Sequence, residues 1–166
     1  MPLTALRDDP LSPDVIAFLA EHLADMRRIS PPESVHALEP AALARSGAAF
    51  WTVREADRPI GCGALTALSD DEGELKSMRT AHTARGRGVA TVLIAAIVAE
   101  AKARGYRRLL LETGTEQYFQ PARRLYERAG FQTRGPFGGY REDPHSAYYE
   151  LELQPDPGMA EAAERF

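Results

Sequence analysis

The chain has 166 residues, 44% of them hydrophobic and 27% charged, and it carries a formal net charge of -4. This length suits one domain with a buried core, and the composition excludes a disordered chain. The negative charge disfavours a nucleic-acid-binding protein, and the single cysteine, Cys62, excludes an internal disulfide framework and a multi-cysteine zinc site.

Targeting signals and metal-ligand clusters are not visible in the sequence. The start, MPLTALRDDP, has no cationic flank followed by an apolar segment, so we expect no signal peptide. The longest apolar stretch, residues 88–101, is too short to span a bilayer. His82 and His145 form no pattern with other ligands, so we expect no metal ion. We therefore expect a cytoplasmic protein with no membrane partner, which suits a lone cysteine.

The first half of the chain alternates periodic apolar segments with turn residues. Apolar side chains between Val15 and Met26 recur at helical spacing, and the prolines at 31–32 end that helix. Residues 50–68 have the form of a β-hairpin. We expect, in chain order, a strand at residues 3–9, helices at 13–28 and 40–45, and strands at 50–55, 60–68 and 74–80.

The second half centres on one long helix. Apolar residues from Val89 to Ala101 share a helical face, and Gly105 follows the predicted end. We expect this helix at 88–104, followed by a buried strand at 106–113, a helix at 121–129 and strands at 131–137 and 146–153.

These elements predict an α/β fold. The strand at 74–80, the long helix and the strand at 106–113 form a β-α-β unit, whose two strands are usually parallel neighbours. The sheet is therefore expected to be mixed, mostly antiparallel and twisted, with this unit at its centre and helices on both faces. One domain would span residues 1–154, followed by a C-terminal tail at 155–166.

A loop rich in glycine and arginine precedes the long helix. The stretch TARGRGVATV, residues 83–92, holds Arg85, Gly86, Arg87 and Gly88 just before the apolar run. Unpaired N–H groups and the helix dipole favour an anion at a helix start, and glycines there can adopt left-handed conformations. The pattern is neither a Walker A motif nor a dinucleotide fingerprint. It indicates a phosphate site, with a tight turn carrying solvated arginines as the alternative.

Two blocks of the sequence resemble the GNAT superfamily of acetyl-CoA-dependent N-acyltransferases. Residues 85–90, RGRGVA, match its R/Q-x-x-G-x-G/A signature, and residues 122–131, ARRLYERAGF, are similar to its A-x-x-L-Y-x-x-x-G-F segment. The resemblance covers residues 3–153 and extends to a bacterial subgroup of small GNAT proteins. It implies the GNAT fold and acetyl-CoA as the co-substrate.

The resemblance also implies how acetyl-CoA would bind. Arg85 and Gly86 would shape the loop, and the pyrophosphate would lie on the backbone amides of Arg87, Gly88, Val89, Ala90 and Thr91. The pantetheine arm would pair with the strand at Met78, Arg79 and Thr80, where a free N–H would stabilise the oxyanion. The family often has asparagine where this chain has Phe119, so Phe119 would stack against the arm or simply pack.

Three residues are candidates for proton transfer. The resemblance gives Tyr126 the position of a general acid that protonates the thiolate, whereas the residues alone indicate a half-buried helix aromatic. Glu74 is the first candidate for the base that deprotonates the amine, and Glu112 is the second. Glu74, Lys76 and Met78 alternate to one face of their strand, so an ion pair between Glu74 and Lys76 is the structural alternative.

The segment at 22–36 would cover the acceptor pocket of this fold. We name His22, Met26, His36 and Lys76 as candidate acceptor-binding residues, with ordinary packing as the alternative for His22. The predicted reaction moves an acetyl group from acetyl-CoA to a primary amine of a small-molecule or amino-acid-like acceptor by direct attack. The alternatives are a protein or peptide acetyltransferase and a non-catalytic coenzyme A sensor. Dimers are common in such families, so a homodimer is compatible with the sequence.

Overall fold

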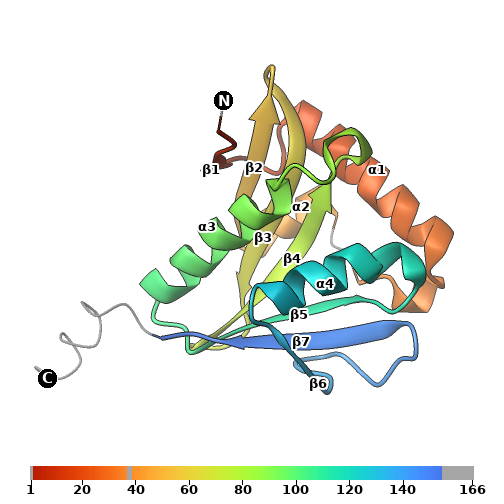
Figure 1. Cartoon of the computed structure of the whole chain (residues 1–166), viewed down its shortest axis with the longest axis vertical. Coiled ribbons are helices and arrows are strands. Elements are labelled where there is room, and N and C mark those ends of the chain that lie inside the picture. Colours follow the sequence, from red (N-terminus) through yellow and green to blue (C-terminus); the bar gives the residue numbers. More distant parts are fainter. Residues whose placement is uncertain (1, 37–38, 155–166) are drawn as a thin grey trace, which may run out of the picture.

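The computed structural model describes residues 2–36 and 39–154, and the expected tail at 155–166 lies outside them. The elements follow the predicted order (Figure 1). The strands are β1 (Ala5–Arg7), β2 (Ala49–Glu55), β3 (Arg58–Ala67), β4 (Glu72–Thr80), β5 (Arg108–Gly114), β6 (Gln132–Arg134) and β7 (Ser146–Glu152). The helices are α1 (Pro13–Ile29), α2 (Pro40–Arg45), α3 (Val89–Ala103) and α4 (Gln120–Arg128), with short 3-10 turns η1 (Pro32–Ser34), η2 (His82–Ala84) and η3 (Gln117–Phe119).

The strands form a 7-stranded sheet with the order β1-β2-β3-β4-β5-β7-β6. Neighbouring strands are antiparallel except β4 and β5, which are parallel, so the predicted mixed sheet is confirmed. β4 and β5 pair only where Glu72–Glu74 meets Arg108–Leu110. Beyond that point the two strands diverge (Figure 1). The edge of β4 that faces β5 therefore carries backbone groups without a strand partner.

Helices cover both faces of the sheet, as predicted. On one face, α1 and α2 bury a cluster that consists of Val15, Phe18, Leu19, Leu43, Phe50, Cys62 and Ala64. On the other face, α3 and α4 pack against a larger cluster that includes Trp51, Leu65, Leu93, Ile97, Leu109, Leu111 and Tyr126. Gly61 lets α3 approach closely, because a Cβ there would clash with Val89 and Leu93. The buried apolar area on both faces holds the sheet between its helices.

Two edge strands are shorter than the sequence predicts. The strand expected at 3–9 ends at Arg7, because the Asp8 and Asp9 carboxylates accept backbone hydrogen bonds and form a turn. The strand expected at 131–137 covers only 132–134, since Pro136 has no N–H to donate. Within the described residues, no helix has the length and hydrophobicity needed to cross a membrane.

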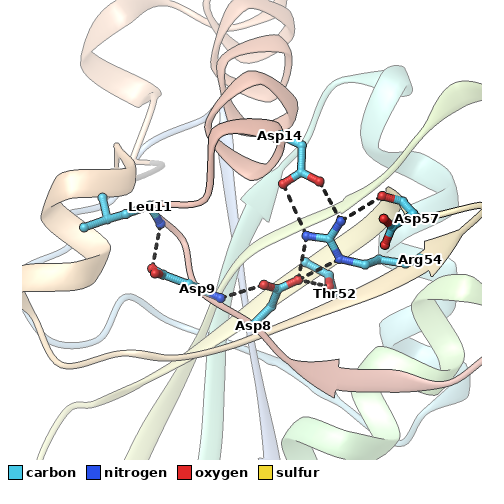
Figure 2. Close-up of polar contacts among 7 residues, drawn as sticks. All are labelled: Asp8, Asp9, Leu11, Asp14, Thr52, Arg54 and Asp57. Carbon is cyan, nitrogen blue, oxygen red and sulfur yellow. Dashed lines mark hydrogen bonds and ion pairs between the residues drawn. The ribbon is translucent and has the colours of Figure 1, made fainter.

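Arg54 joins β2 to the end of β1 and to the start of α1 (Figure 2). Its guanidinium donates to Asp8 (Nε–Oδ2 2.9 Å) and to Asp14 in the first turn of α1 (Nη1–Oδ2 2.6 Å). The Thr52 hydroxyl also donates to Asp8. Burial opposes the ionisation of Asp8, but hydrogen bonds from Thr52, the Asp9 backbone and Arg54 outweigh it and lower the pKa.

Replacing Arg54 with methionine should reduce the free energy of unfolding by about 1–2 kcal/mol at pH 7, because it removes the cation that compensates partly buried Asp8. A carboxyl group with a lowered pKa stabilises the fold only while it is ionised. The difference in free energy of unfolding between the wild type and Arg54→Met should therefore have its full value well above pH 3.8 and shrink as the pH falls below 3.8. Urea denaturation at pH 7 and pH 3 measures this. Arg58→Met, at an exposed arginine of the same hairpin, should change stability by less than about 0.5 kcal/mol, and equal losses in both variants would contradict the prediction.

Candidate active site

The loop before α3 has the geometry of an anion-binding site. Gly86 and Gly88 have φ of 78° and 85°, the left-handed region that the sequence predicts for them. The first hydrogen bond of α3 runs from the Val92 N–H to the Gly88 carbonyl at 3.2 Å. The amides of Val89–Thr91 therefore have no acceptor inside the helix. With the helix dipole behind them, these donors can hold a phosphate.

A first cavity of about 430 Å³ opens at this loop. Its walls come from α1, β4, the loop and the start of α3, η3 and α4. Arg79, Arg85 and Arg128 bring cations to its lining, whereas Asp25 is the carboxylate among the lining residues. The excess of cations suits an anionic ligand.

The two arginines of the loop have different partners. Arg85 lies over the ring of Tyr118 (5.3 Å to the centroid) and donates to its hydroxyl at 3.1 Å, in the cavity wall. Arg87 instead forms an exposed ion pair with Glu55 of β2. Phe119 is buried beside Tyr118 and also lines the cavity, so it both packs internally and offers an apolar wall. Arg85 is thus the loop arginine whose side chain faces the cavity.

A β-bulge in β4 separates residues that simple alternation puts together. The register of β4 against β3 shifts around Ser77, whose φ is 57°. The extra residue turns Met78 to the face opposite Glu74 and Lys76, so the prediction that these three share a face is wrong. Arg79 takes that place instead and lies against α1. Met78 lines the first cavity.

The structure separates the predicted acceptor residues into two groups. His22 and Met26 of α1 line the first cavity, whereas His36 and Lys76 line the second. The bulge places Arg79 under α1, where it forms an ion pair with Asp25 at 2.8 Å. Burial and the nearby Arg79 lower the pKa of His22 to about 4, so His22 is neutral at pH 7.

A second cavity, of about 570 Å³, lies on the face of β4 that carries Glu74 and Lys76. It is lined by Glu33, His36, Glu74, Lys76 and residues 139–143 of the loop between β6 and β7. The His36 ring meets the Tyr140 ring edge-on, with centroids 4.9 Å apart. Burial and Lys76 lower the pKa of His36, so this side chain too is neutral at pH 7.

Tyr140 is a site residue that sequence reasoning missed. Its hydroxyl donates to Glu74 Oε2 at 2.6 Å and accepts from Lys76 Nζ at 2.9 Å. Lys76 also forms an ion pair with Glu74 at 3.2 Å, which confirms the structural alternative for these two residues. The run GGYRED at 138–143 joins glycines to an aromatic and three charged residues, and this is the signal that marks such a loop as functional.

Glu112 of β5 is a half-buried carboxyl group near Lys76, Glu74 and Asp143, three residues that line the second cavity. Burial raises its pKa to about 7; the Ser146 hydroxyl and Lys76 act in the opposite direction, while Glu74 and Asp143 raise it further. A carboxyl group with this pKa gains and loses a proton near neutral pH, as a general base must.

Tyr126 of α4 is 5% exposed and lines the first cavity. Its ring packs edge-on against Phe131, with centroids 5.7 Å apart. Burial and the neighbouring Glu112 raise the pKa of Tyr126 well above its usual value, so its hydroxyl stays protonated at neutral pH. A protonated hydroxyl in a cavity wall can serve as a proton donor.

Polar contacts fasten the segment after α1 to the loop between β6 and β7. The Ser34 hydroxyl donates to Asp143 at 2.6 Å. Ser30 donates to Glu116 at 3.1 Å, and Glu116 also contacts His145 Nδ1 at 3.1 Å. These contacts hold the segment after α1 against the loop whose residues 139–143 line the second cavity.

The fold is that of the acyl-CoA N-acyltransferases. A candidate acyl-CoA N-acyltransferase from Klebsiella pneumoniae matches with a TM-score of 0.74 at 28% identity, over 92% of this chain and 98% of that chain. A GNAT family acetyltransferase from Elizabethkingia anophelis, solved with acetyl-CoA bound, matches with a TM-score of 0.61 at 19% identity, over 91% of this chain and 98% of that one. The predicted fold class is therefore confirmed.

The chain belongs to the GNAT family of acetyltransferases, whose family model matches residues 16–131. The uncharacterized N-acetyltransferase YsnE of Bacillus subtilis is 45% identical over 88% of this chain and 97% of its own length. The IAA acetyltransferase of Azospirillum brasilense is 37% identical over 91% of this chain and 98% of its own. The chain is therefore an acyltransferase enzyme, and the resemblance drawn from residues 85–90 and 122–131 is confirmed.

Proposed function

We propose that this chain is an N-acetyltransferase that moves the acetyl group of acetyl-CoA to the primary amine of a small molecule, amino-acid-like amines included. The observation that carries the proposal is that two cavities lie along β4, at the edge where it diverges from β5: Met78, Arg79 and Thr80 line the first, and Glu74 and Lys76 line the second. A donor in the first cavity and an acceptor in the second would meet at this edge. The amine would then attack the thioester directly, without a covalent enzyme intermediate.

The first cavity has the features that acetyl-CoA requires. The amides of residues 87–91 would hold the pyrophosphate, with the side chain of Arg85 adding positive charge. The pantetheine arm would pair with the free edge of β4 at 78–80, much as an added strand does. The Met78 N–H would stabilise the oxyanion that forms as the amine attacks.

Two groups would handle the protons of the reaction. As the carbon–sulfur bond breaks, Tyr126 would protonate the leaving thiolate, and Glu112 would take the proton that the amine nitrogen loses. Glu112 raises the pKa of Tyr126, and its proton would return to the phenolate to complete the cycle. The contacts favour Glu112 over Glu74, which the sequence ranks first, because Lys76 and Tyr140 already engage the Glu74 carboxylate.

A small acceptor fits the second cavity better than a folded protein does. Its volume of about 570 Å³ falls in the range of small-molecule sites. The acidic lining would also suit a basic peptide, so a peptide acetyltransferase is the second candidate. Tyr126 in the donor cavity argues against a non-catalytic sensor.

A thiol-release assay tests the proposal. The purified chain with acetyl-CoA is given small primary amines, amino acids and basic peptides, and we expect turnover of at least one small amine above the acceptor-free rate. Turnover of peptides alone would favour the second candidate. Tight coenzyme A binding without turnover of any acceptor would favour a sensor and contradict the proposal.

Glu112→Gln should lower kcat by about 10²-fold at pH 8, within the range for loss of a general base. In the wild type, kcat at saturating acceptor should rise with pH through an apparent pKa of about 7, because only the ionised carboxylate accepts a proton. The pH profile of the variant should lack this rise near pH 7, while any rise caused by ionisation of the amine should remain in both proteins. Glu74→Gln is the matched control and should keep the rise near pH 7. Loss of that rise in Glu74→Gln alone would assign the base to Glu74.

A further inference from the structure

The two cavities carry opposite charge. The lining of the first cavity contains three arginines and one carboxylate, an excess of positive charge that suits the proposed diphosphate of acetyl-CoA. In the second cavity the balance is reversed, since Lys76 and Arg141 stand against Glu33, Glu74, Glu142 and Asp143. His36 adds no positive charge at pH 7, because burial and Lys76 lower its pKa. A ligand of the second cavity therefore meets a negative surface.

Most of this negative charge has no cation beside it. Lys76 is engaged by Glu74 at 3.2 Å. Asp143 accepts from the Ser34 hydroxyl and the His145 N–H, two neutral donors that lower its pKa and keep it ionised. Glu33 and Glu142 are exposed and form no ion pair with the residues that the structure describes. Three carboxylates at the rim are thus available to a cationic group.

We propose that the acceptor carries a second cationic group, so that the substrate class is a diamine or a longer polyamine. One amino group, deprotonated at the divergent edge of β4, attacks the thioester carbon. The other stays an ammonium ion and binds the carboxylates of Glu33, Glu142 and Asp143. An acceptor that carries a carboxylate in place of the second ammonium meets like charge at the same rim. This inference rests on the proposed function, because it takes the second cavity as the acceptor site.

Three acceptors of similar length separate charge from size: butylamine, putrescine and 4-aminobutyrate. With saturating acetyl-CoA, putrescine should have a KM at least about tenfold below that of butylamine, since each compensated charge contributes about 1 kcal/mol at a solvated rim. 4-Aminobutyrate should have the highest KM. The advantage of putrescine should shrink between low and high salt, because salt screens exposed charges.

Variants that remove single carboxylates test which residues bind the second ammonium group. Glu33→Gln and Glu142→Gln should each raise the KM for putrescine about fivefold, by loss of about 1 kcal/mol, and raise the KM for butylamine by a smaller factor. Glu152→Gln, an exposed carboxylate at the far end of β7 outside the cavity, is the matched control and should change nothing. Equal KM values for putrescine in all four proteins would overturn the inference.

Binding without turnover separates this inference from the proposed function. Putrescine is titrated calorimetrically into the chain saturated with coenzyme A, which cannot donate an acetyl group. Weaker binding in Glu33→Gln and Glu142→Gln supports the inference even if no amine is acetylated. No binding of putrescine, tighter binding of 4-aminobutyrate, or a preference for a basic peptide over putrescine would each overturn it, and acetylation of butylamine would still support the proposed function.

Discussion

Tyr126→Phe should lower kcat by about 10³-fold and leave the Kd for acetyl-CoA nearly unchanged. The leaving thiolate of coenzyme A is basic and takes up a proton, and loss of a positioned general acid typically lowers the rate by 10²- to 10⁴-fold. The ring itself stays buried against Phe131, so removal of one oxygen atom should not disturb the fold. Steady-state kinetics and calorimetric titration with coenzyme A measure the two quantities.

The pH dependence adds a second expectation for Tyr126. Burial and Glu112 raise its pKa well above the usual value, so the acid form persists as the pH increases. The wild type should therefore lose no activity on the alkaline side up to about pH 10 through this group. Tyr149→Phe is the matched control, since its ring lies 6.4 Å from that of Tyr126 but its hydroxyl bonds to Glu127. Full turnover in Tyr126→Phe at every pH would show that the hydroxyl donates no proton.

Gly88→Glu should weaken acetyl-CoA binding by about 10²-fold or more. A glutamate at this position would have to adopt the left-handed backbone conformation, which costs about 1–2 kcal/mol. Its carboxylate would lie beside the amides proposed to hold the pyrophosphate. Two orders of magnitude in Kd correspond to about 2.7 kcal/mol, which we expect mainly from repulsion between this carboxylate and the pyrophosphate. Titration with coenzyme A measures the loss.

Gly47 after α2 provides the matched control for Gly88. Its φ is 71°, and a Cβ at either glycine would meet no atom within 4 Å. Gly47→Glu should therefore lower the free energy of unfolding by a similar amount while the Kd for coenzyme A stays unchanged. Intact binding in Gly88→Glu, or an equal loss in both variants, would mean that the loop before α3 does not hold the phosphates.

Local sequence signals were sufficient for most of the elements. Apolar spacing in residues 15–26 and 89–101 identifies α1 and α3, since one face of each helix must be buried. Glycines at 86 and 88 identify the left-handed loop, because other residues rarely adopt that conformation. The edge strands β1 and β6 came out shorter, because competing turns and a proline decide where pairing stops.

The catalytic surroundings were less accessible from the sequence. Ser77 takes a left-handed φ that no local signal announces, and this one residue moves Met78 away from Glu74. Tyr140 is more than sixty positions from Glu74 in the chain, yet its hydroxyl is 2.6 Å from that carboxylate. Contacts of this kind come from the pairing of distant strands and their loops, so spacing along the chain does not encode them.

The sequence by itself determined the family, the α/β class and the left-handed glycine loop before α3, because each depends on neighbouring residues: a period, a pair of glycines, a short motif. Only the tertiary structure decided that two cavities of opposite charge lie along β4, and that Lys76 and Tyr140 hold the Glu74 carboxylate. The net charge of a cavity and the burial of its side chains depend on residues from separate elements. Both are therefore set only when the sheet and its helices are assembled.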